Sequence, residues 1–266
     1  MLQLIYSNKA GRNFNSDPQV NWKALFKASE DSFTSSIFGL LLYLPAEQFW
    51  DIIINSSQIK PDIEFPGQVI GYEFWPSWKN KNCYRCEPDI YIEFENLNLI
   101  VEAKRWDGEQ QLESQWQNEL EAYLESIESD KSVCLLAAGG IRNGGVTKIS
   151  TPDQRQSCPV IQCSWSSLLT QISTLKNQLI KNTEKIPQDY TNLNILKDLV
   201  IAFGIHGFQT GYLFNTMPTS ISLSKETHYT HITFITPAIL HYIPNYHISS
   251  NSAQTLSQWQ KPTQKN

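Results

Sequence analysis

Three side chains, at two neighbouring points of the chain, have the chemical types that metal-assisted hydrolysis needs. Asp89 follows Pro88, and Glu102-Ala103-Lys104 begins thirteen positions after Asp89. A hard divalent cation such as Mg²⁺ takes carboxylate and carbonyl oxygens, keeps several waters and binds substrate phosphates. A lysine beside it can orient or deprotonate an attacking water, or stabilise charge on a pentavalent phosphorus. The spacing therefore indicates phosphodiester chemistry, provided that the fold brings the three side chains together.

Two strands are predicted to carry these side chains. The segment 89–94 alternates and is rich in Ile, Tyr and Phe, and the segment 99–104 is its expected partner. Asn96, Leu97 and Asn98 lie between the two segments as turn residues. The pattern therefore predicts an antiparallel hairpin.

The pairing within this hairpin follows from the alternation of side chains along a strand. With two or four loop residues, Asp89 pairs across from Lys104 and Tyr91 across from Glu102, so the polar groups converge on one face. The alternative is an ordinary hairpin with solvent-facing salt bridges. The apolar Ile100-Val101 before Glu102 argues against it, because buried charges without a partner cost several kcal/mol.

The surrounding pattern predicts a mixed β-sheet flanked by helices, an α/β fold. Helices are expected at 30–44, 46–55, 108–129, 164–180 and 192–203, and further strands at 68–75, 133–138 and 159–163. Leu112 is expected on the buried side of the long helix 108–129, and Ser164 is expected as an N-cap.

Pro88-Asp89 with Glu102-Ala103-Lys104 resembles the PD-(D/E)XK, or restriction-endonuclease-like, nuclease superfamily. The resemblance covers roughly residues 30–180 in the order of elements. It implies a restriction-endonuclease-like core with a C-terminal extension, and Mg²⁺ as the cofactor with Mn²⁺ as a substitute. It further implies that Asp89, Glu102 and the Ala103 carbonyl are metal ligands and that Lys104 positions the water.

Glu30 and two arginines could complete this site. Many members of the superfamily carry a glutamate on the helix before the sheet, and Glu30 lies on the apolar side of its predicted helix. The alternative for Glu30 is an N-terminal acid that interacts with the helix macrodipole. Arg85 and Arg105 flank the predicted site and could hold phosphates. Ordinary surface arginines are an equally good interpretation.

Many members also place a glutamine on the helix after the Glu-x-Lys strand. Gln111 and Gln115 are four residues apart and are expected on one helix face, beside the buried stripe. Gln110 and Gln117 leave the choice open.

The chain has 266 residues, with 41% hydrophobic residues, which excludes collagen-like, coiled-coil and disordered classes. We expect a nuclease-like domain over 1–185, a helix- and strand-rich extension over 186–248 and a disordered tail over 249–266.

The net charge of −5 is unevenly distributed. Residues 81–130 hold 4 Lys and Arg against 13 Asp and Glu, a net of −9, and the remainder holds 17 against 13, a net of +4. Nucleic-acid binding should therefore depend on a divalent ion.

Cysteine usage and hydropathy favour a reducing, cytoplasmic setting. Cys83-x-x-Cys86 with Cys158 and Cys163 could form a four-thiolate zinc site, but the second spacing is wide and free buried thiols are favoured. The longest apolar run, 37–44, has eight residues against the ~20 that cross a bilayer, and no basic segment followed by a hydrophobic one begins the chain. We expect no membrane association.

The function expected from these features is Mg²⁺-dependent hydrolysis of DNA, by an endonuclease rather than an exonuclease, in restriction, phage defence or repair. One alternative is a catalytically inactive nuclease fold that binds nucleic acid or acts as a scaffold. Another is a nuclease for RNA or single strands, in which the aromatic stretch 72–78 would supply stacking surfaces. The sequence leaves a homodimer or a partner protein open.

Overall fold

The computed structural model describes residues 26–79, 85–108, 110–141, 145–151 and 156–209. The chain divides into two compact units, residues 1–215 and 216–266, and all described residues belong to the first. The strands expected within the extension and the expected tail at 249–266 lie outside the described residues.

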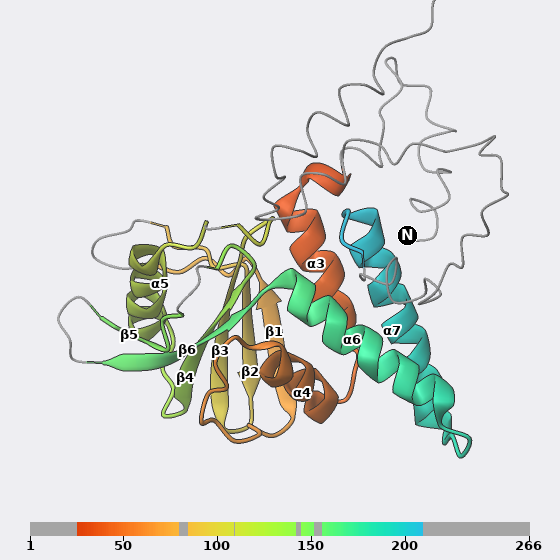
Figure 1. The fold of residues 1–266 in the computed structure, drawn as a ribbon. Helices are drawn as coiled ribbons and strands as arrows, with labels where there is room; N and C mark the ends of the chain where they lie inside the picture. The colour runs from red at the N-terminus through yellow and green to blue at the C-terminus, as the bar shows by residue number, and fades with distance from the viewer. Residues whose placement is uncertain (1–25, 80–84, 109, 142–144, 152–155, 210–266) are drawn as a thin grey trace, which may run out of the picture. The chain divides into compact units, whose positions relative to one another are not determined.

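The first unit contains a mixed sheet and helices on both of its faces (Figure 1). Its elements are α3 (Glu30–Leu41), α4 (Ala46–Ser56), β1 (Val69–Phe74), β2 (Ile90–Phe94), β3 (Leu97–Ala103), α5 (Glu113–Ser126), β4 (Ser132–Ala138), β5 (Lys148–Ser150), β6 (Ser157–Cys163), α6 (Trp165–Lys181) and α7 (Pro187–Ile205). The six strands lie in the order β1-β2-β3-β4-β6-β5. The α/β class, the mixed sheet and its flanking helices are therefore confirmed.

The centre of the sheet is parallel and buried on both faces. β3 pairs in parallel with β4, and β4 with β6, whereas β1, β2 and β3 form an antiparallel meander. All seven residues of β3 are buried. A strand covered on both faces reads as a continuous apolar run, which explains the sequence Leu99-Ile100-Val101.

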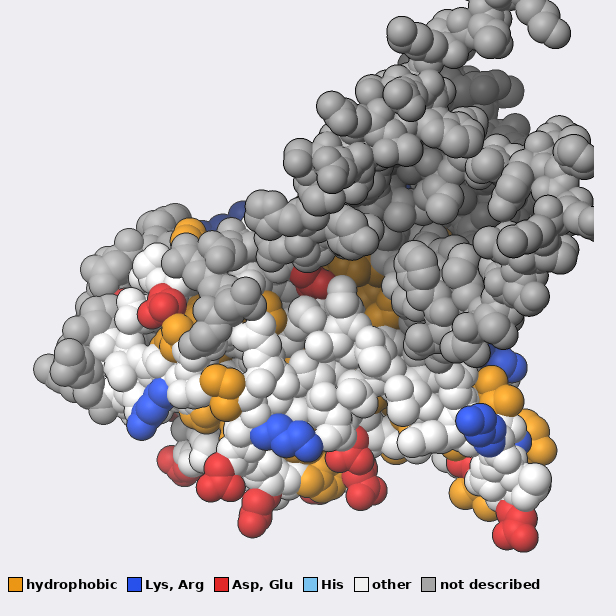
Figure 2. All heavy atoms as spheres, in the orientation of Figure 1, with side chains coloured by type: hydrophobic (Ala, Val, Ile, Leu, Met, Phe, Trp, Pro, Cys, Tyr) orange, Lys and Arg blue, Asp and Glu red, His pale blue; other side chains and the backbone are white. Residues whose placement is uncertain are grey.

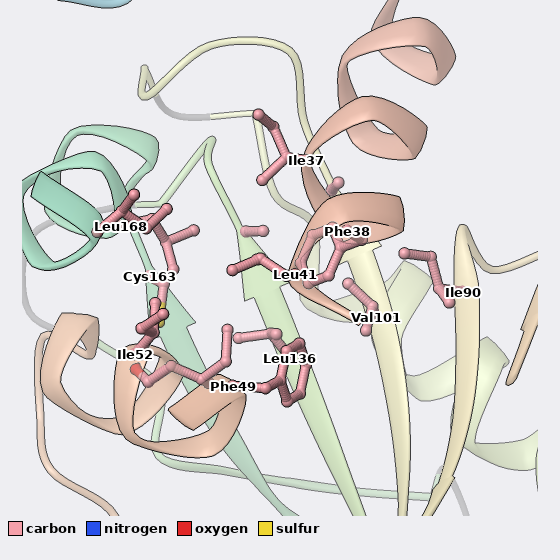
Figure 3. Packing of buried hydrophobic residues seen from close by; sticks show 14 of the residues in the cluster. Ile37, Phe38, Leu41, Phe49, Ile52, Ile90, Val101, Leu136, Cys163 and Leu168 are labelled. Carbon is pink, nitrogen blue, oxygen red and sulfur yellow. Dashed lines mark hydrogen bonds between the residues drawn. The ribbon is translucent and has the colours of Figure 1, made fainter. Parts of the chain in front are cut away.

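The larger core lies between one face of the sheet and the helices α3, α4, α6 and α7. Val101 and Leu136 from the strands meet Phe38 and Leu41 of α3, while Cys163 of β6 lies near Leu168 of α6 (Figure 3). Helix α7 adds Leu196, Leu199 and Phe203 to this core. The domain boundary expected after residue 185 therefore falls between two helices, α6 and α7, that pack against each other.

Helix α5 covers the opposite face of the sheet. Trp116 and Leu120 pack on Leu135 and Ala137 of β4, and Tyr123 packs near Ile100 of β3. Because side chains alternate along β3, Glu102 shares this face with Ile100, whereas Val101 and Ala103 face α3.

Several local predictions were wrong in detail, among them the start of α7, which lies at Pro187 rather than at 192. Helix α5 begins at Glu113 rather than at 108, and Leu112 is exposed instead of buried. Leu97 and Asn98 belong to strand β3, not to the turn, because both are buried and pair with Ser132 and Val133 of β4. The short strand β5 was not predicted. The helix start at Glu30 and the Ser164 N-cap are confirmed; the Ser164 hydroxyl accepts from the Ser167 N–H at 3.0 Å.

Candidate active site

The hairpin β2–β3 brings Asp89 and Glu102 together at one end of the sheet. Ile90 pairs with Val101, so the next step of the register places Asp89 opposite Glu102. The predicted pairing of Asp89 with Lys104 was therefore wrong by two residues. An even shift keeps every side chain on its predicted face, so the convergence of the polar groups survives. The Ala103 N–H donates to Asp89 Oδ2 at 2.7 Å and fixes that carboxyl.

The two carboxyl groups are buried and act on each other. Burial, followed by the charge of Glu102, raises the pKa of Asp89 to about 7. Burial also raises the pKa of Glu102, against the opposing effect of Lys104. Both groups therefore ionise less readily than carboxyls in water, and a cation placed between them would relieve the repulsion.

Lys104 lies beside these carboxyl groups as a cation. Its ammonium forms an ion pair with Glu102 Oε1. Burial lowers the pKa of Lys104, but the charges of Glu102, Glu30 and Asp89 outweigh burial and raise it overall. In the metal-free protein the Lys104 side chain is therefore suited to stabilising negative charge or orienting a water, and not to removing a proton.

The backbone of Lys104 is held by the end of β4 and the start of α6. Its N–H donates to the Ala138 carbonyl at 2.8 Å, and its carbonyl accepts from Trp165 Nε1 at 2.6 Å. Gly140 has a φ of +61°, and a Cβ there would lie 2.7 Å from Lys104 Cβ. Glycine at this position permits both the left-handed backbone and the close approach.

Glu30 reaches the same end of the sheet from the first turn of α3. Its Oε2 accepts from the Arg105 N–H at 2.6 Å, and its charge acts on both Asp89 and Lys104. The structure therefore places Glu30 near the predicted site, with one carboxylate oxygen bound to backbone.

The two candidate glutamines have different positions. Gln115, in the first turn of α5, donates from Nε2 to Glu102 Oε1 at 2.7 Å. Gln111 precedes the helix, so the two do not share a helix face as predicted. Its Nε2 donates to the carbonyls of Glu102 and Gly139, and its Oε1 accepts from Trp116 Nε1 at 2.8 Å. Gln115 thus contacts the carboxyl group of Glu102, and Gln111 ties β3 to the end of β4.

Glu119 is a further acidic group that the sequence interpretation missed. It lies on the buried face of α5 and is 2% exposed, while Glu102 is 3% exposed. Burial, followed by the charge of Glu102, raises the pKa of Glu119 well above its usual value. Helical spacing could have found it, because Glu119 falls between Trp116 and Tyr123 on the apolar stripe.

The two flanking arginines differ in burial and in their partners. Arg85 is exposed and forms an ion pair with Glu87. Arg105 is buried, and its guanidinium donates to the carbonyls of Lys27 and His206. It also lies 4.0 Å from the centroid of the Trp106 ring. Arg105 therefore links the segment before α3 and the C-terminal end of α7 to the site.

The described cysteines behave as buried thiols. Cys86, Cys134, Cys158 and Cys163 are free and buried. Burial raises the pKa of Cys158 to about 12, and it also raises the pKa values of Cys134 and Cys163. Cys86 belongs to a different core cluster from Cys158 and Cys163. Cys83 lies outside the described residues.

The donor set fits a hard cation better than a soft one. In the described part of the chain, no group of three or more His, Cys, Asp and Glu side chains is arranged to hold a metal ion. Mg²⁺ is usually bound through one or two carboxylates, with water and substrate phosphate as its other ligands. Asp89 and Glu102, two mutually repelling buried carboxyls, offer oxygen ligands of this type.

Comparisons with known proteins found one relative in part of the chain. An uncharacterized protein of Pasteurella multocida (strain Pm70) is 38% identical over 117 residues, which cover 43% of this chain and 44% of the relative. No family model matches the chain, and no solved structure matches it.

Among the described residues, no helix combines the length and the apolar character that crossing a membrane requires.

Proposed function

We propose that this protein is a Mg²⁺-dependent nuclease of the restriction-endonuclease-like fold that hydrolyses phosphodiester bonds in DNA. The observation that carries the proposal is the meeting of Asp89, Glu102 and Lys104 at one end of the sheet. Two buried carboxyls beside a lysine lower the stability of the fold, because each is desolvated and they repel each other. A catalytic role explains their presence.

The residues have separate roles in this proposal. Asp89 and Glu102 would hold Mg²⁺, with the Ala103 carbonyl as a further ligand and Mn²⁺ as a substitute ion. The bound ion supplies Lewis-acid polarisation of a phosphate oxygen and lowers the pKa of a bound water. Lys104, held cationic by the three surrounding acids, orients the attacking water and stabilises negative charge on the phosphate. Gln115 keeps the Glu102 carboxylate in place.

The charge distribution supports ion-dependent binding. On the face of the molecule in Figure 2, acidic and basic side chains of the described residues are interspersed and do not form a single basic stripe. Binding to a polyanion through neutralised phosphates normally uses such basic residues. A divalent ion at Asp89 and Glu102 would supply positive charge where the chain is locally most acidic.

Two exposed tryptophans favour a second candidate, a nuclease for single strands or RNA. Trp75 is 39% exposed, has an unusual φ of +52° and donates its N–H to the Asp89 carbonyl at 2.9 Å. Trp106, two residues after Lys104, is 45% exposed. Exposed aromatic rings beside such a site can stack on unpaired bases. Trp78, by contrast, is buried in the core.

A cleavage assay tests the proposal. Purified protein is incubated with duplex DNA, single-stranded DNA and RNA, in Mg²⁺ and in chelator. We expect cleavage of duplex DNA in Mg²⁺ only, and loss of cleavage in Lys104→Ala. Lys131→Ala is the matched control, because Lys131 also forms an ion pair, with Glu93, at the far end of the hairpin. Full activity of Lys104→Ala would refute the assignment.

The outcome with other substrates separates the remaining candidates. Cleavage restricted to single strands or RNA would favour the second candidate. Absence of cleavage, together with absence of Mg²⁺ and Mn²⁺ binding in calorimetry, would favour a catalytically inactive scaffold.

A further inference from the structure

The buried face of α5 carries an acidic side chain that the proposed reaction leaves without a role. Gln115 lies one helical turn before Glu119, and its Nε2 donates to Glu119 Oε1 at 3.0 Å and to Glu102 Oε1 at 2.7 Å. One amide group therefore bridges the two carboxyl groups, one from the helix and one from strand β3.

The Glu119 side chain also interacts directly with that of Glu102 through a side-chain hydrogen bond. Glu119 Oε2 is buried, and after burial itself the charge of Glu102 acts most strongly on the Glu119 carboxyl group. Leucine would fill the same position among Trp116 and Leu120 without a desolvated carboxyl group. A role in packing therefore does not account for glutamate at this position.

We propose that Glu119 is a positioning residue, which holds the Gln115 amide and the Glu102 carboxylate in the orientation that metal binding requires. This inference rests on the proposed function of Glu102. The Gln115 amide has two hydrogens, and Glu119 accepts one of them, which fixes the rotation of the amide and directs the other at Glu102.

The size of the effect follows from the behaviour of residues that support metal ligands. Loss of such a partner typically costs ~10–100-fold in metal affinity. Glutamine at position 119 retains an oxygen that can accept from Gln115 and adds an N–H₂ group that can donate to Glu102. Leucine retains the volume and loses both interactions. The pair of substitutions therefore separates hydrogen bonding from packing.

The experiment is a calorimetric titration of Mn²⁺ into the full chain, without nucleic acid. We expect Glu119→Leu to bind Mn²⁺ ~10–100-fold more weakly than wild type, and Glu119→Gln to bind close to wild type. Glu113→Gln, on the exposed side of the same helix, is the control and should bind as wild type. Unchanged affinity in Glu119→Leu would overturn the inference. So would an equal loss in Glu119→Gln, because the charge itself would then be needed.

A metal-free measurement separates this inference from the proposed function. Wild-type protein that binds no Mn²⁺ would contradict the proposed function. Whether Glu119 anchors the Gln115 amide, which we call the anchoring, would then be decided by urea unfolding of Glu119→Leu, Gln115→Ala and the double variant. Coupling of about fivefold or more in the unfolding constant supports the anchoring, and additive effects overturn it. Should Glu119→Leu fail to fold, Gln115→Ala takes its place in the titration. It removes the bridging amide and should show the same loss.

Discussion

Replacing Asp89 by asparagine should stabilise the protein at alkaline pH in chelator while abolishing the metal-dependent cleavage that we propose. The substitution removes a negative charge that burial and Glu102 disfavour, and it retains an oxygen that can accept from the Ala103 N–H. The pKa of Asp89 rises from an ordinary value of 3.8 to about 7. At about 1.4 kcal/mol per pKa unit, ionisation of Asp89 in the folded state costs about 4 kcal/mol above pH 7.

The observed gain should be smaller than this upper bound. Asparagine must also be desolvated, and the attraction between Asp89 and Lys104 is lost. We therefore expect Asp89→Asn to raise the free energy of unfolding at pH 8 by about 1–2 kcal/mol. The direction in which stability changes with pH follows from the raised pKa of Asp89. Stability contributed by protonated Asp89 is complete below pH 3.8 and is lost as the pH rises through about 7.

The assay is urea unfolding in chelator at pH 5, 6, 7 and 8, with wild type and Asp89→Asn measured side by side. The advantage of the variant should grow from pH 5 to pH 8. Asp51→Asn, at an exposed position of α4, controls for the substitution itself. A difference that is the same at all four pH values, or a variant less stable than wild type at pH 8, would refute the reasoning.

Three further substitutions test how the site is held. Arg105→Ala should lower the free energy of unfolding by about 2–3 kcal/mol, because the carbonyls that its guanidinium binds lose their donor. Urea unfolding measures this free energy, and a loss below about 1 kcal/mol would count against the packing described. Gly140→Ala should cost at least about 1 kcal/mol and slow cleavage, since its Cβ would meet that of Lys104; unchanged rates would contradict this. Asp107→Ala should lower the free energy of unfolding by about 1 kcal/mol, because the Asp107 carboxylate accepts from the N–H groups of Trp165 and Ser166 at the start of α6. An unchanged melting temperature would argue against this role of Asp107.

The sequence predicted the hairpin and its polar face because both depend on local alternation. Its register was off by two residues because Leu97 resembles a turn residue between two asparagines, and only its burial against β4 reveals it as strand. The prediction of the candidate site was unaffected by this error, since a shift of two residues leaves Asp89, Glu102 and Lys104 on the same face.

Contacts between distant parts of the chain were not predictable in this way. Arg105 looked like a surface arginine beside the motif, yet its partners Lys27 and His206 lie 78 and 101 residues away. Gln111 was assigned to a helix because the apolar pattern predicted one over 108–129, whereas its hydrogen bonds to the Glu102 and Gly139 carbonyls hold it outside the helix. Both positions are determined by backbone carbonyls that no local pattern specifies.

The central claim is that Asp89 and Glu102 together bind a divalent ion beside Lys104. Anomalous diffraction from crystals soaked in Mn²⁺ tests it most directly, because it locates the ion without requiring a substrate. The account predicts a peak between the Asp89 and Glu102 carboxylates in the wild-type protein and its absence in Asp89→Ala. A wild-type crystal with no peak between these carboxylates at saturating Mn²⁺ would contradict it.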